Sequence, residues 1–330
     1  MNRKVSVAPM MDCTDRHERY FLRLISKNTL LYTEMIVDEA ISRGDKKKLL
    51  EFNINEKPVA LQIGGSSPKL LSEASKIGED FGYDEINLNL GCPSKKVEKN
   101  KFGACLMKEP NLVADCLSKM KSATKLPITI KTRIGYDNVE DYETFHKFIS
   151  IIKSTGIKTF IIHARKAMLG KFTPKQNLNI PPLKYEYVYK LKEDFPKEEI
   201  IINGGITSTG EVINHLKKID GVMIGRAAYH TPYILAEIEK KIFKNNDVPS
   251  RQEVIEKLIP YVKDEIKKGT RLNQIMRHTL GLFHGQNGAS HWKRYLSENM
   301  CVRDADIKKI DHIMDKIKFN NKDTRVGQTA

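Results

Sequence analysis

The chain has 330 residues, and its 56 lysines and arginines exceed its 41 aspartates and glutamates to give a formal net charge of +15. No apolar run is long enough to cross a bilayer, and we expect no signal peptide and a cytoplasmic protein without membrane contact. Its five scattered cysteines never form a Cys-x-x-Cys pair, which argues against a disulfide framework and against a metal site. The positive charge favours a polyanionic partner such as nucleic acid, although charge spread evenly over a surface would select no partner.

Short apolar segments alternate with stretches long enough for a helix. The eight apolar segments cover residues 5–8, 30–35, 59–63, 86–90, 128–131, 160–163, 200–203 and 222–225. Helical patterns cover residues 15–26, 69–81, 112–123, 141–154 and 210–217. This alternation predicts a parallel sheet, and eight strands fit a closed (β/α)8 TIM barrel. A Rossmann sheet is disfavoured because no Gly-x-Gly-x-x-Gly motif follows a predicted strand.

The pattern becomes purely helical after about residue 240. Ser250 and Glu253 have the spacing of a capping box, and a helical pattern then continues to Gly269, with Pro260 expected to kink it. Further helices are predicted over residues 272–283, 289–300 and 304–317. We therefore expect a catalytic barrel over 1–244, a C-terminal all-helical domain over 245–319 and a disordered tail over 320–330.

Polar, reactive and glycine residues gather at the ends of most predicted strands. In chain order they include Pro9, Met10, Met11, Asp12, Gln62, Asn89, Cys92, Lys131, Arg133, His163, Arg165, Asn203, Gly204, Gly205, Gly225 and Arg226, of which Asp12 and Arg133 are given no specific role. Barrels of this type keep their active sites at the carboxyl ends of their strands, so these residues predict a site there. The loops after strands seven and eight commonly bind phosphate, which suits glycine N–H groups and an arginine. The alternative is that these glycines only turn the chain.

Several of these residues fit more than one role. Lys131 could form a Schiff base or hold the electron-rich edge of a flavin, and Gln62 suits a flavin or a nucleobase. His163 could be a ligand, a phosphate contact or a core histidine. Cys92 lies on a loop stiffened by Pro93, where it is either a structural cysteine or a reactive thiol. A thiol with an ordinary pKa of about 8.5 is protonated near neutrality and can donate a proton, whereas neighbouring lysines could make it a nucleophile.

Together these motifs resemble the flavin-dependent tRNA-dihydrouridine synthases, and most closely their bacterial A subfamily. The matching segments of the barrel are residues 8–12, 31–35, 60–65, 83–89, 91–94, 102–107, 131–135, 161–167, 180–183, 203–206 and 220–223. In the helical part, residues 280–283 and 294–299 also match. The resemblance covers nearly the whole chain in the correct order.

The resemblance implies a cofactor, a reaction and a role for each residue. Pro9, Met10, Met11 and Gln62 would line the FMN ring, and Lys131 would meet its polar edge. The phosphate end would be held by His163, Asn203, Gly204, Gly205, Gly225 and Arg226. NADPH would reduce the FMN, hydride would pass to C6 of a uracil, and Cys92 would protonate C5 as general acid. The product would be 5,6-dihydrouridine in the D-loop of tRNA, at position 20 and its neighbour 20a.

The resemblance also implies contacts with tRNA. The uracil must be turned out of the stacked RNA to reach the barrel, where Asn89 would help to hold it. Lys175 matches a subfamily contact position, and Arg165 lies in a basic loop that could reach phosphates. We expect Lys293 and Arg294 to form a basic face of the helical domain, together with Arg277 and beside Trp292. A merely solvated charged surface is the alternative.

Two residues depart from the subfamily pattern. Cys13 replaces a usual tryptophan, and Leu178 replaces an arginine that often touches tRNA, so one phosphate contact is expected to be missing. Two other functions stay open: a flavin dehydrogenase that acts on a free pyrimidine, and a non-catalytic tRNA-binding protein. A Schiff-base aldolase that uses Lys131 is a more remote alternative. We expect a monomer.

Overall fold

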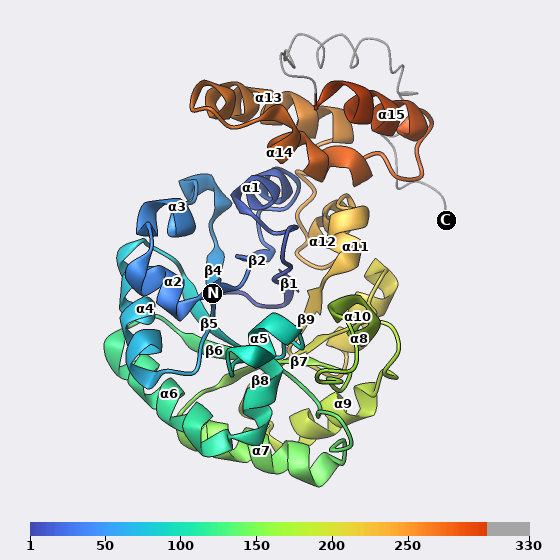
Figure 1. Ribbon diagram of the computed structural model, residues 1–330. Helices are drawn as coiled ribbons and strands as arrows, with labels where there is room; N and C mark the ends of the chain where they lie inside the picture. The colour runs from blue at the N-terminus through green and yellow to red at the C-terminus, as the bar shows by residue number, and fades with distance from the viewer. Residues whose placement is uncertain (302–330) are drawn as a thin grey trace. The chain divides into compact units, whose positions relative to one another are not determined.

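The computed structural model describes residues 1–301 (Figure 1). The helix expected over 304–317 and the disordered tail expected over 320–330 lie outside the described residues. The expected helical domain over 245–319 is described only as far as residue 301.

Eight parallel strands form a closed barrel. They are β1 (Val5–Val7), β2 (Leu30–Tyr32), β4 (Val59–Gly64), β5 (Glu85–Leu90), β6 (Ile128–Arg133), β7 (Thr159–His163), β8 (Glu199–Asn203) and β9 (Gly221–Ile224). The strands pair in the order β2-β1-β9-β8-β7-β6-β5-β4, and a pairing of β2 with β4 closes the ring. The short strand β3 (Ile36–Val37) adds only to the edge of β4. The predicted TIM barrel and its eight strands are confirmed.

Helices cover the outside of the barrel in the connections between strands (Figure 1). The expected ones are α4 (Pro68–Asp80), α6 (Pro110–Ala123), α7 (Tyr142–Ser154) and α10 (Thr209–Leu216). Their starts follow from the sequence: Ser67 and Asp141 accept hydrogen bonds from the first turns of α4 and α7, and Ser208 forms a capping box with Glu211. The helix expected over 15–26 is also present, as α1 (Arg16–Ile25), and most of it belongs to a second compact unit.

Several short elements inside the connections were not predicted. They are α2 (Asp38–Arg43), α3 (Lys46–Leu50), η1 (Ile54–Glu56), α5 (Lys95–Lys99), η2 (Gly103–Lys108), α8 (Pro174–Asn177) and the longer α9 (Tyr185–Asp194). Most are only one or two turns long, and a segment of that length has too few residues to show a helical period.

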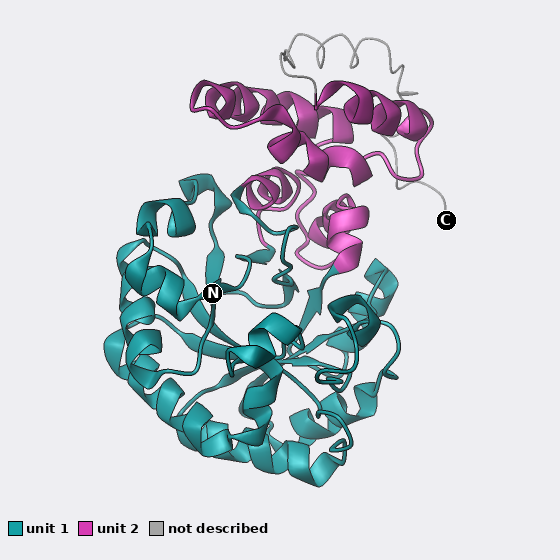
Figure 2. Ribbon diagram, viewed as in Figure 1, with its two compact units in different colours: residues 1–16, 29–225 teal, residues 17–28, 226–330 magenta. Residues whose placement is uncertain are grey.

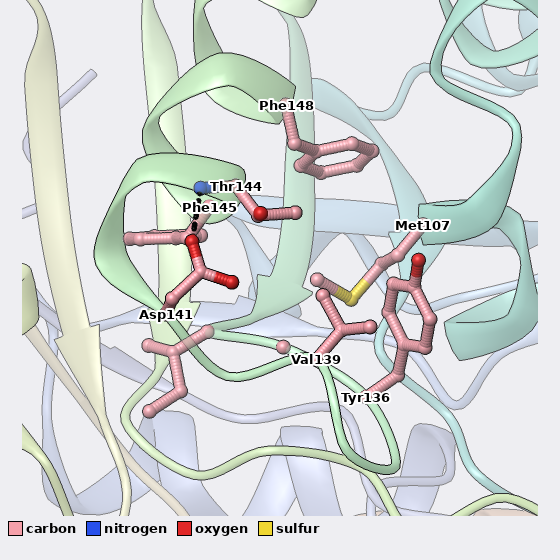
Figure 3. A pocket seen from close by; sticks show the side chains of 9 residues that line it. Met107, Tyr136, Val139, Asp141, Thr144, Phe145 and Phe148 are labelled. Atoms are coloured by element: carbon pink, nitrogen blue, oxygen red, sulfur yellow. Dashed lines mark hydrogen bonds between the residues drawn. The ribbon is translucent and has the colours of Figure 1, made fainter.

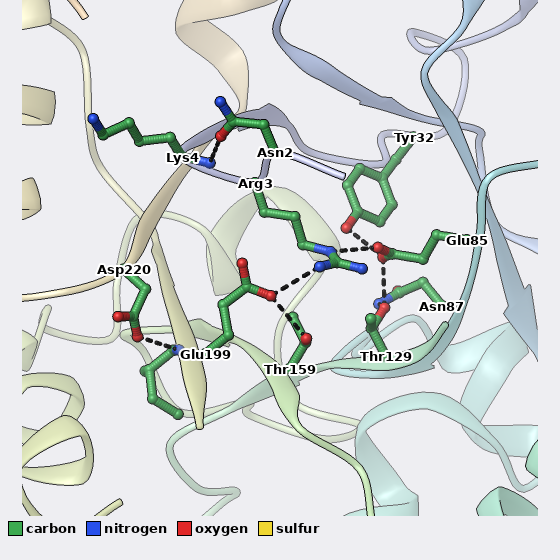
Figure 4. Close-up of polar contacts among 11 residues, drawn as sticks. Asn2, Arg3, Lys4, Tyr32, Glu85, Asn87, Thr129, Thr159, Glu199 and Asp220 are labelled. Atoms are coloured by element: carbon green, nitrogen blue, oxygen red, sulfur yellow. Dashed lines mark hydrogen bonds and ion pairs between the residues drawn. The ribbon is translucent and has the colours of Figure 1, made fainter. Parts of the chain in front are cut away.

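The barrel interior changes character along its axis. Its middle is an apolar cluster formed by Ala8, Leu30, Tyr32, Ala60, Ile161, Ile201 and Met223. At the amino ends of the strands, Arg3 lies between two carboxylates, with Nε 2.6 Å from Glu85 and Nη1 2.9 Å from Glu199 (Figure 4). The apolar layer and the partly buried ion pairs therefore occupy the middle and the amino-terminal end of the barrel, and the carboxyl ends of the strands are left for function.

The chain forms two compact units (Figure 2). Among the described residues, the barrel unit contains 1–16 and 29–225, and the helical unit contains 17–28 and 226–301. The helical unit includes most of α1, with α11 (Arg226–His230), α12 (Ile234–Lys241), α13 (Arg251–Lys267), α14 (Leu272–Met276), η3 (Arg277–Gly281) and α15 (Ala289–Asn299). The boundary expected at 244–245 falls inside this unit. The assignment of 1–244 and 245–319 as separate functional domains stays a prediction.

The helical unit has its own core. Trp292 is fully buried, its indole N–H donates to the carbonyl of Thr279 at 3.0 Å, and its ring lies edge-on to Phe283. The expected capping box of Ser250 and Glu253 begins α13. Trp292 therefore lies in the interior, and the exposed Lys293 and Arg294 follow it directly in the chain. No helix within residues 1–301 is long and apolar enough to cross a membrane.

Candidate active site at the carboxyl ends of the barrel strands

Cys92 lies two residues beyond the end of β5, on a turn that Asn89 organises. The Asn89 side-chain oxygen accepts the backbone N–H groups of Gly91 at 3.1 Å and of Cys92 at 2.9 Å. The carbonyl of Cys92 in turn accepts the N–H of Ala104 at 3.0 Å. Gly103 has a φ of +74°, and a Cβ there would lie only 2.7 Å from that carbonyl. The thiol is therefore carried by a turn that is fixed from both sides.

The surroundings of Cys92 favour its protonated form. Burial raises the pKa of the Cys92 thiol above its usual value, while the Ser94 backbone and the charges of Arg133 and Lys131 oppose this rise only in part. A thiol with a raised pKa is protonated at neutral pH. This is the form that a general acid requires, and it is a poor nucleophile.

Lys131 lies beside the Cys92 turn, because it pairs with Asn89 in the register of β5 and β6. Its Nζ donates to Oδ1 of Asn203 at 3.0 Å, and the amide of Asn203 donates to the carbonyl of Met223 at 2.8 Å. Within residues 1–301, no carboxylate lies within ion-pair distance of the Lys131 ammonium. Burial, and then the neighbouring charge of Arg133, lower the pKa of Lys131 to about 7.

This lowered pKa predicts a pH dependence of stability. Lys131 has a pKa of about 7 in the folded protein and an ordinary value of 10.5, so between these values the unfolded chain binds more protons. The free energy of unfolding of the ligand-free protein is therefore expected to rise with pH across this window. Lys131→Met removes this contribution, and urea unfolding at a series of pH values measures it. The exposed Lys69→Met is the control that keeps the rise, and an identical pH profile for Lys131→Met and the parent protein would contradict the prediction.

The loop after β8 has a backbone that only glycine adopts easily. Gly204 and Gly205 have φ angles of +121° and +70°. A Cβ on Gly204 would lie 2.8 Å from the His163 ring, and one on Gly205 would lie 2.6 Å from Leu183. The hydroxyl of Tyr185 donates to the carbonyl of Gly204 at 2.6 Å. Because a peptide's C=O and N–H point in opposite directions, this bond turns the N–H of Gly205 away from Tyr185.

The loop after β1 lies next to the loop after β9. Thr14 closes the first loop, since its hydroxyl accepts the N–H of Met10 at 3.0 Å. Met10 packs against the barrel core, and its sulfur would lie 3.7 Å from a Cβ built on Gly225. Pro9 is half-buried, whereas the Met11 side chain is 57% exposed. Arg226, the next residue after Gly225, is the exposed first residue of α11 in the helical unit.

Arg133 is a residue of the site that the sequence analysis did not assign. Its buried guanidinium donates to three backbone carbonyls: Gly91 at 2.8 Å, Lys166 at 3.1 Å and Asn177 at 3.2 Å. The first carbonyl belongs to the Cys92 turn, and the other two belong to the loop that follows β7. Arg133 therefore ties these two loops together. Its position two residues after Lys131 on the same strand, hence on the same face, was the available signal.

The fully buried Asn177 shapes the loop that follows β7. Its amide donates to the carbonyls of Met168, Phe172 and Thr173, and its oxygen accepts the N–H of Met168 at 2.7 Å. This network folds residues 168–177 into a compact loop. The exposed Lys175 lies on this loop, in α8.

The other RNA-contact candidates differ in their surroundings. Arg165 is half-buried, and its guanidinium donates to the carbonyls of Pro181 and Asn179, so it also stabilises its own loop. Lys293 and Arg294 are exposed on α15 in the helical unit. Their contacts with RNA stay predictions.

A small pocket is lined by a different set of residues (Figure 3). It is lined mainly by apolar side chains, among them Met107, Tyr136, Val139, Phe145 and Phe148. None of the predicted site residues lines it. Within residues 1–301, no cluster of histidine, cysteine, aspartate or glutamate side chains could hold a metal ion.

The fold and the residues at the carboxyl ends of its strands define a TIM-barrel enzyme, with a protonated thiol and a lysine near a diglycine loop. The model of the dihydrouridine synthase family matches residues 6–318, and the chain belongs to this family. The protein is therefore an oxidoreductase that reduces uridine in tRNA to dihydrouridine.

Individual proteins support this assignment. The chain is 52% identical to a tRNA-dihydrouridine(20/20a) synthase from Synechocystis sp., over 96% of this chain and 95% of that protein. It is 50% identical to the proteins of the same name from Shewanella oneidensis, over 93% and 92% of the two chains, and from Escherichia coli, over 94% and 90%. Among solved structures, a 2-naphthoyl-CoA reductase complex is similar with a TM-score of 0.52 at 12% identity, covering 71% of this chain and 49% of that chain. This last likeness concerns the fold alone.

Proposed function

We propose that the protein uses FMN and NADPH to reduce the C5–C6 double bond of uridines 20 and 20a in the D-loop of tRNA. The positions come from the names of relatives that share about half of its residues. We further propose that it acts as a monomer on tRNA in the cytoplasm.

The observation that carries the flavin proposal is that the Lys131 amine has Asn203 as a partner but, within residues 1–301, no carboxylate. A buried ammonium without a carboxylate partner is costly unless an electron-rich group binds beside it. The polar edge of an isoalloxazine ring is such a group. Gln62 is proposed to offer an amide N–H to the ring. The half-buried Pro9 and Met10, together with Met11, are proposed to supply apolar surface for it.

The loop after β8 fits the phosphate end of FMN. A Cβ at Gly204 would collide with His163, and one at Gly205 would collide with Leu183, so both positions require glycine. Tyr185 holds the peptide that joins the two glycines. Backbone N–H groups in such a loop can bind an anion. Asn203, Gly225 and Arg226 complete the set that we propose for this end. When bound, FMN reduced by NADPH would supply a hydride to C6 of the uracil.

Cys92 then supplies the proton that completes the reduction. Its protonated thiol gives a proton to C5 of the uracil, so that the double bond becomes a single bond and a thiolate is left behind. Arg133 and Lys131 lower the energy of that thiolate, because both positive charges favour the ionised form of Cys92. Solvent can restore the proton. Asn89 is proposed to hold the uracil, and Arg165, Lys175, Lys293 and Arg294 are proposed to contact the RNA backbone.

Dihydrouridine mapping tests this function. The purified protein is expected to be yellow, to release FMN on denaturation and to form dihydrouridine at positions 20 and 20a of an unmodified tRNA transcript in the presence of NADPH. A transcript with cytidine at both positions is the control. A colourless protein that cannot be reconstituted with FMN would contradict the flavin proposal, and modification at other D-loop positions would contradict the site assignment. Turnover of free uracil without tRNA would favour a pyrimidine dehydrogenase instead.

A further inference from the structure

A series of hydrogen bonds runs through the barrel interior from the amides near Cys92 toward the amino ends of the strands. We call the end at Asn89 the upper end and the end at Glu85 the lower end. Asn89 Nδ2 donates to Gln62 Oε1 at 2.8 Å, and Gln62 Nε2 donates to Asn87 Oδ1 at 2.7 Å. Asn87 Nδ2 donates to the Thr129 hydroxyl at 2.8 Å, which donates in turn to Glu85 at 2.6 Å. We call these five residues the polar column. Figure 4 shows its lower part.

The polar column is sealed from solvent and follows the strand register. Asn89 is 8% exposed and Gln62 1%, and the other three members are fully buried. Gln62, Asn87 and Thr129 are cross-strand neighbours on β4, β5 and β6. Because water cannot replace the partners of a fully buried group, the column has to satisfy itself.

The lower end of the column can only accept hydrogen bonds. One oxygen of Glu85 accepts the hydroxyls of Tyr32 and Thr129, both at 2.6 Å, while its other oxygen pairs with Arg3 (Figure 4). An ionised carboxylate has no proton to donate. The Thr129 hydroxyl must therefore point its hydrogen down toward Glu85 and offer its lone pairs upward to Asn87.

At the upper end, the neighbours of Asn89 are two backbone N–H groups, which can only donate hydrogen bonds. The backbone N–H groups of Gly91 and Cys92 both point at the side-chain oxygen of Asn89. The Asn89 nitrogen must then face Gln62. Turning any one of the column's three amides by 180° would place oxygen against oxygen and nitrogen against nitrogen. The two ends therefore require the same single direction for every hydrogen bond in between.

We propose that Glu85 is a positioning residue, which acts through Thr129 and Asn87 to fix the amide orientations of Gln62 and Asn89, and thereby the Cys92 turn. The Glu85 carboxylate lies at the amino end of β5, whereas the Cys92 thiol follows its carboxyl end. The partners of Glu85 are Tyr32, Thr129 and Arg3, so it acts on the Cys92 turn only through other side chains. Gln62 and Asn89 each have a second amide N–H that takes no part in the column. On the proposed function, these N–H groups would be available to acceptor atoms of the flavin or the uracil.

The test removes one hydroxyl from the column. Thr129→Val keeps the shape of the side chain and leaves the pair of Glu85 with Arg3 in place, but disconnects that pair from Asn87. Thr159→Val is a matched control: Thr159 is also a buried strand threonine, and its hydroxyl donates at 2.8 Å to Glu199, the other carboxylate partner of Arg3. Thr159 has no bond to the column. Thr129→Ser restores the hydroxyl.

The first measurement needs no turnover. The purified full-length variants are treated with iodoacetamide at several pH values, and alkylation is measured by mass spectrometry on the Cys92 peptide. Release of the turn is expected to raise the Cys92 alkylation rate about threefold or more in Thr129→Val, with Thr159→Val and Thr129→Ser within about twofold of the parent protein. Equal rates in Thr129→Val and Thr159→Val would overturn the proposal.

The second measurement is turnover with tRNA. Thr129→Val is expected to lower kcat about tenfold with little change in KM for tRNA, because a displaced acid slows the chemical step more than it weakens RNA binding. Equal loss of kcat in both valine variants would mean a general effect on stability and would also overturn the proposal. If the parent protein forms no dihydrouridine, the proposed function fails, while the alkylation rates still decide whether the column exists.

Discussion

Replacing Cys92 by alanine is expected to lower the rate of dihydrouridine formation by about 10²- to 10⁴-fold, the usual contribution of a general acid. The fold and flavin binding are expected to survive, because Asn89 accepts the backbone N–H of residue 92 and Ala104 donates to its carbonyl, so the turn does not depend on the sulfur. Single-turnover reduction of a tRNA transcript measures the loss. Bound flavin is measured by absorbance in the same sample.

Cys105→Ala is the matched control for this loss. Cys105 lies on the neighbouring η2, is also half-buried, and burial raises the pKa of its thiol as well. Its Sγ donates to the carbonyl of Phe102 at 3.1 Å. The Cys105 variant is expected to keep its activity. Normal turnover by Cys92→Ala, or an equal loss in both variants, would remove Cys92 from the mechanism.

The pH profile gives a second view of the same group. Because the pKa of Cys92 is raised, the thiol keeps its proton at neutral pH and loses it only above the usual thiol range. The rate of the step that protonates C5 is therefore expected to stay level through neutral pH and to fall only in strongly alkaline solution. A rate that already falls as the pH rises toward neutral would show that the thiol ionises too readily to be the acid, and a rate that increases with pH would show that Cys92 acts as a thiolate.

Replacing Arg133 by methionine is expected to lower kcat/KM for tRNA by about 100-fold, since small displacements of catalytic groups have effects of this size. The guanidinium holds the carbonyl of Gly91 on the Cys92 turn and those of Lys166 and Asn177 on the loop that follows β7. Without it, three buried carbonyls lose their donor and the two loops separate. Each hydrogen bond to a charged group contributes about 1.5–3 kcal/mol, so the free energy of unfolding is also expected to fall by several kcal/mol.

Lys192→Met separates the loss of loop positioning from the loss of stability. Lys192 also donates to two backbone carbonyls, those of Pro196 at 3.0 Å and Glu198 at 2.9 Å, and these lie before the amino end of β8, away from the site. This variant is expected to lose stability and to keep its activity. Urea unfolding and steady-state kinetics on both variants distinguish the two effects. Full activity of Arg133→Met at a temperature where the variant is folded would show that Arg133 does not position the two loops for catalysis.

Much of this protein was determined by local sequence pattern. The alternation of apolar segments with helical stretches placed all eight barrel strands, and it placed Gln62, Cys92, Lys131, Asn203 and the diglycine loop at strand ends. Such predictions succeed because a buried parallel strand and the turn after it leave a signal within a few adjacent residues. Strands that run in parallel around one barrel must then end at the same side, so the candidate site could be assembled without coordinates.

The tertiary structure alone decided which polar groups meet. Arg133 and the carbonyl of Gly91 are 42 residues apart in the chain, and Lys131 and Asn203 are 72 apart. No local period reports contacts of this kind, because they depend on the order of strands around the barrel and on loop conformation. The same is true of the burial of Trp292, of the Arg165 bonds to its own loop, and of the direction of the polar column. The sequence determined which side chains reach the carboxyl ends of the strands, and the closed barrel determined what each of them can donate or accept there.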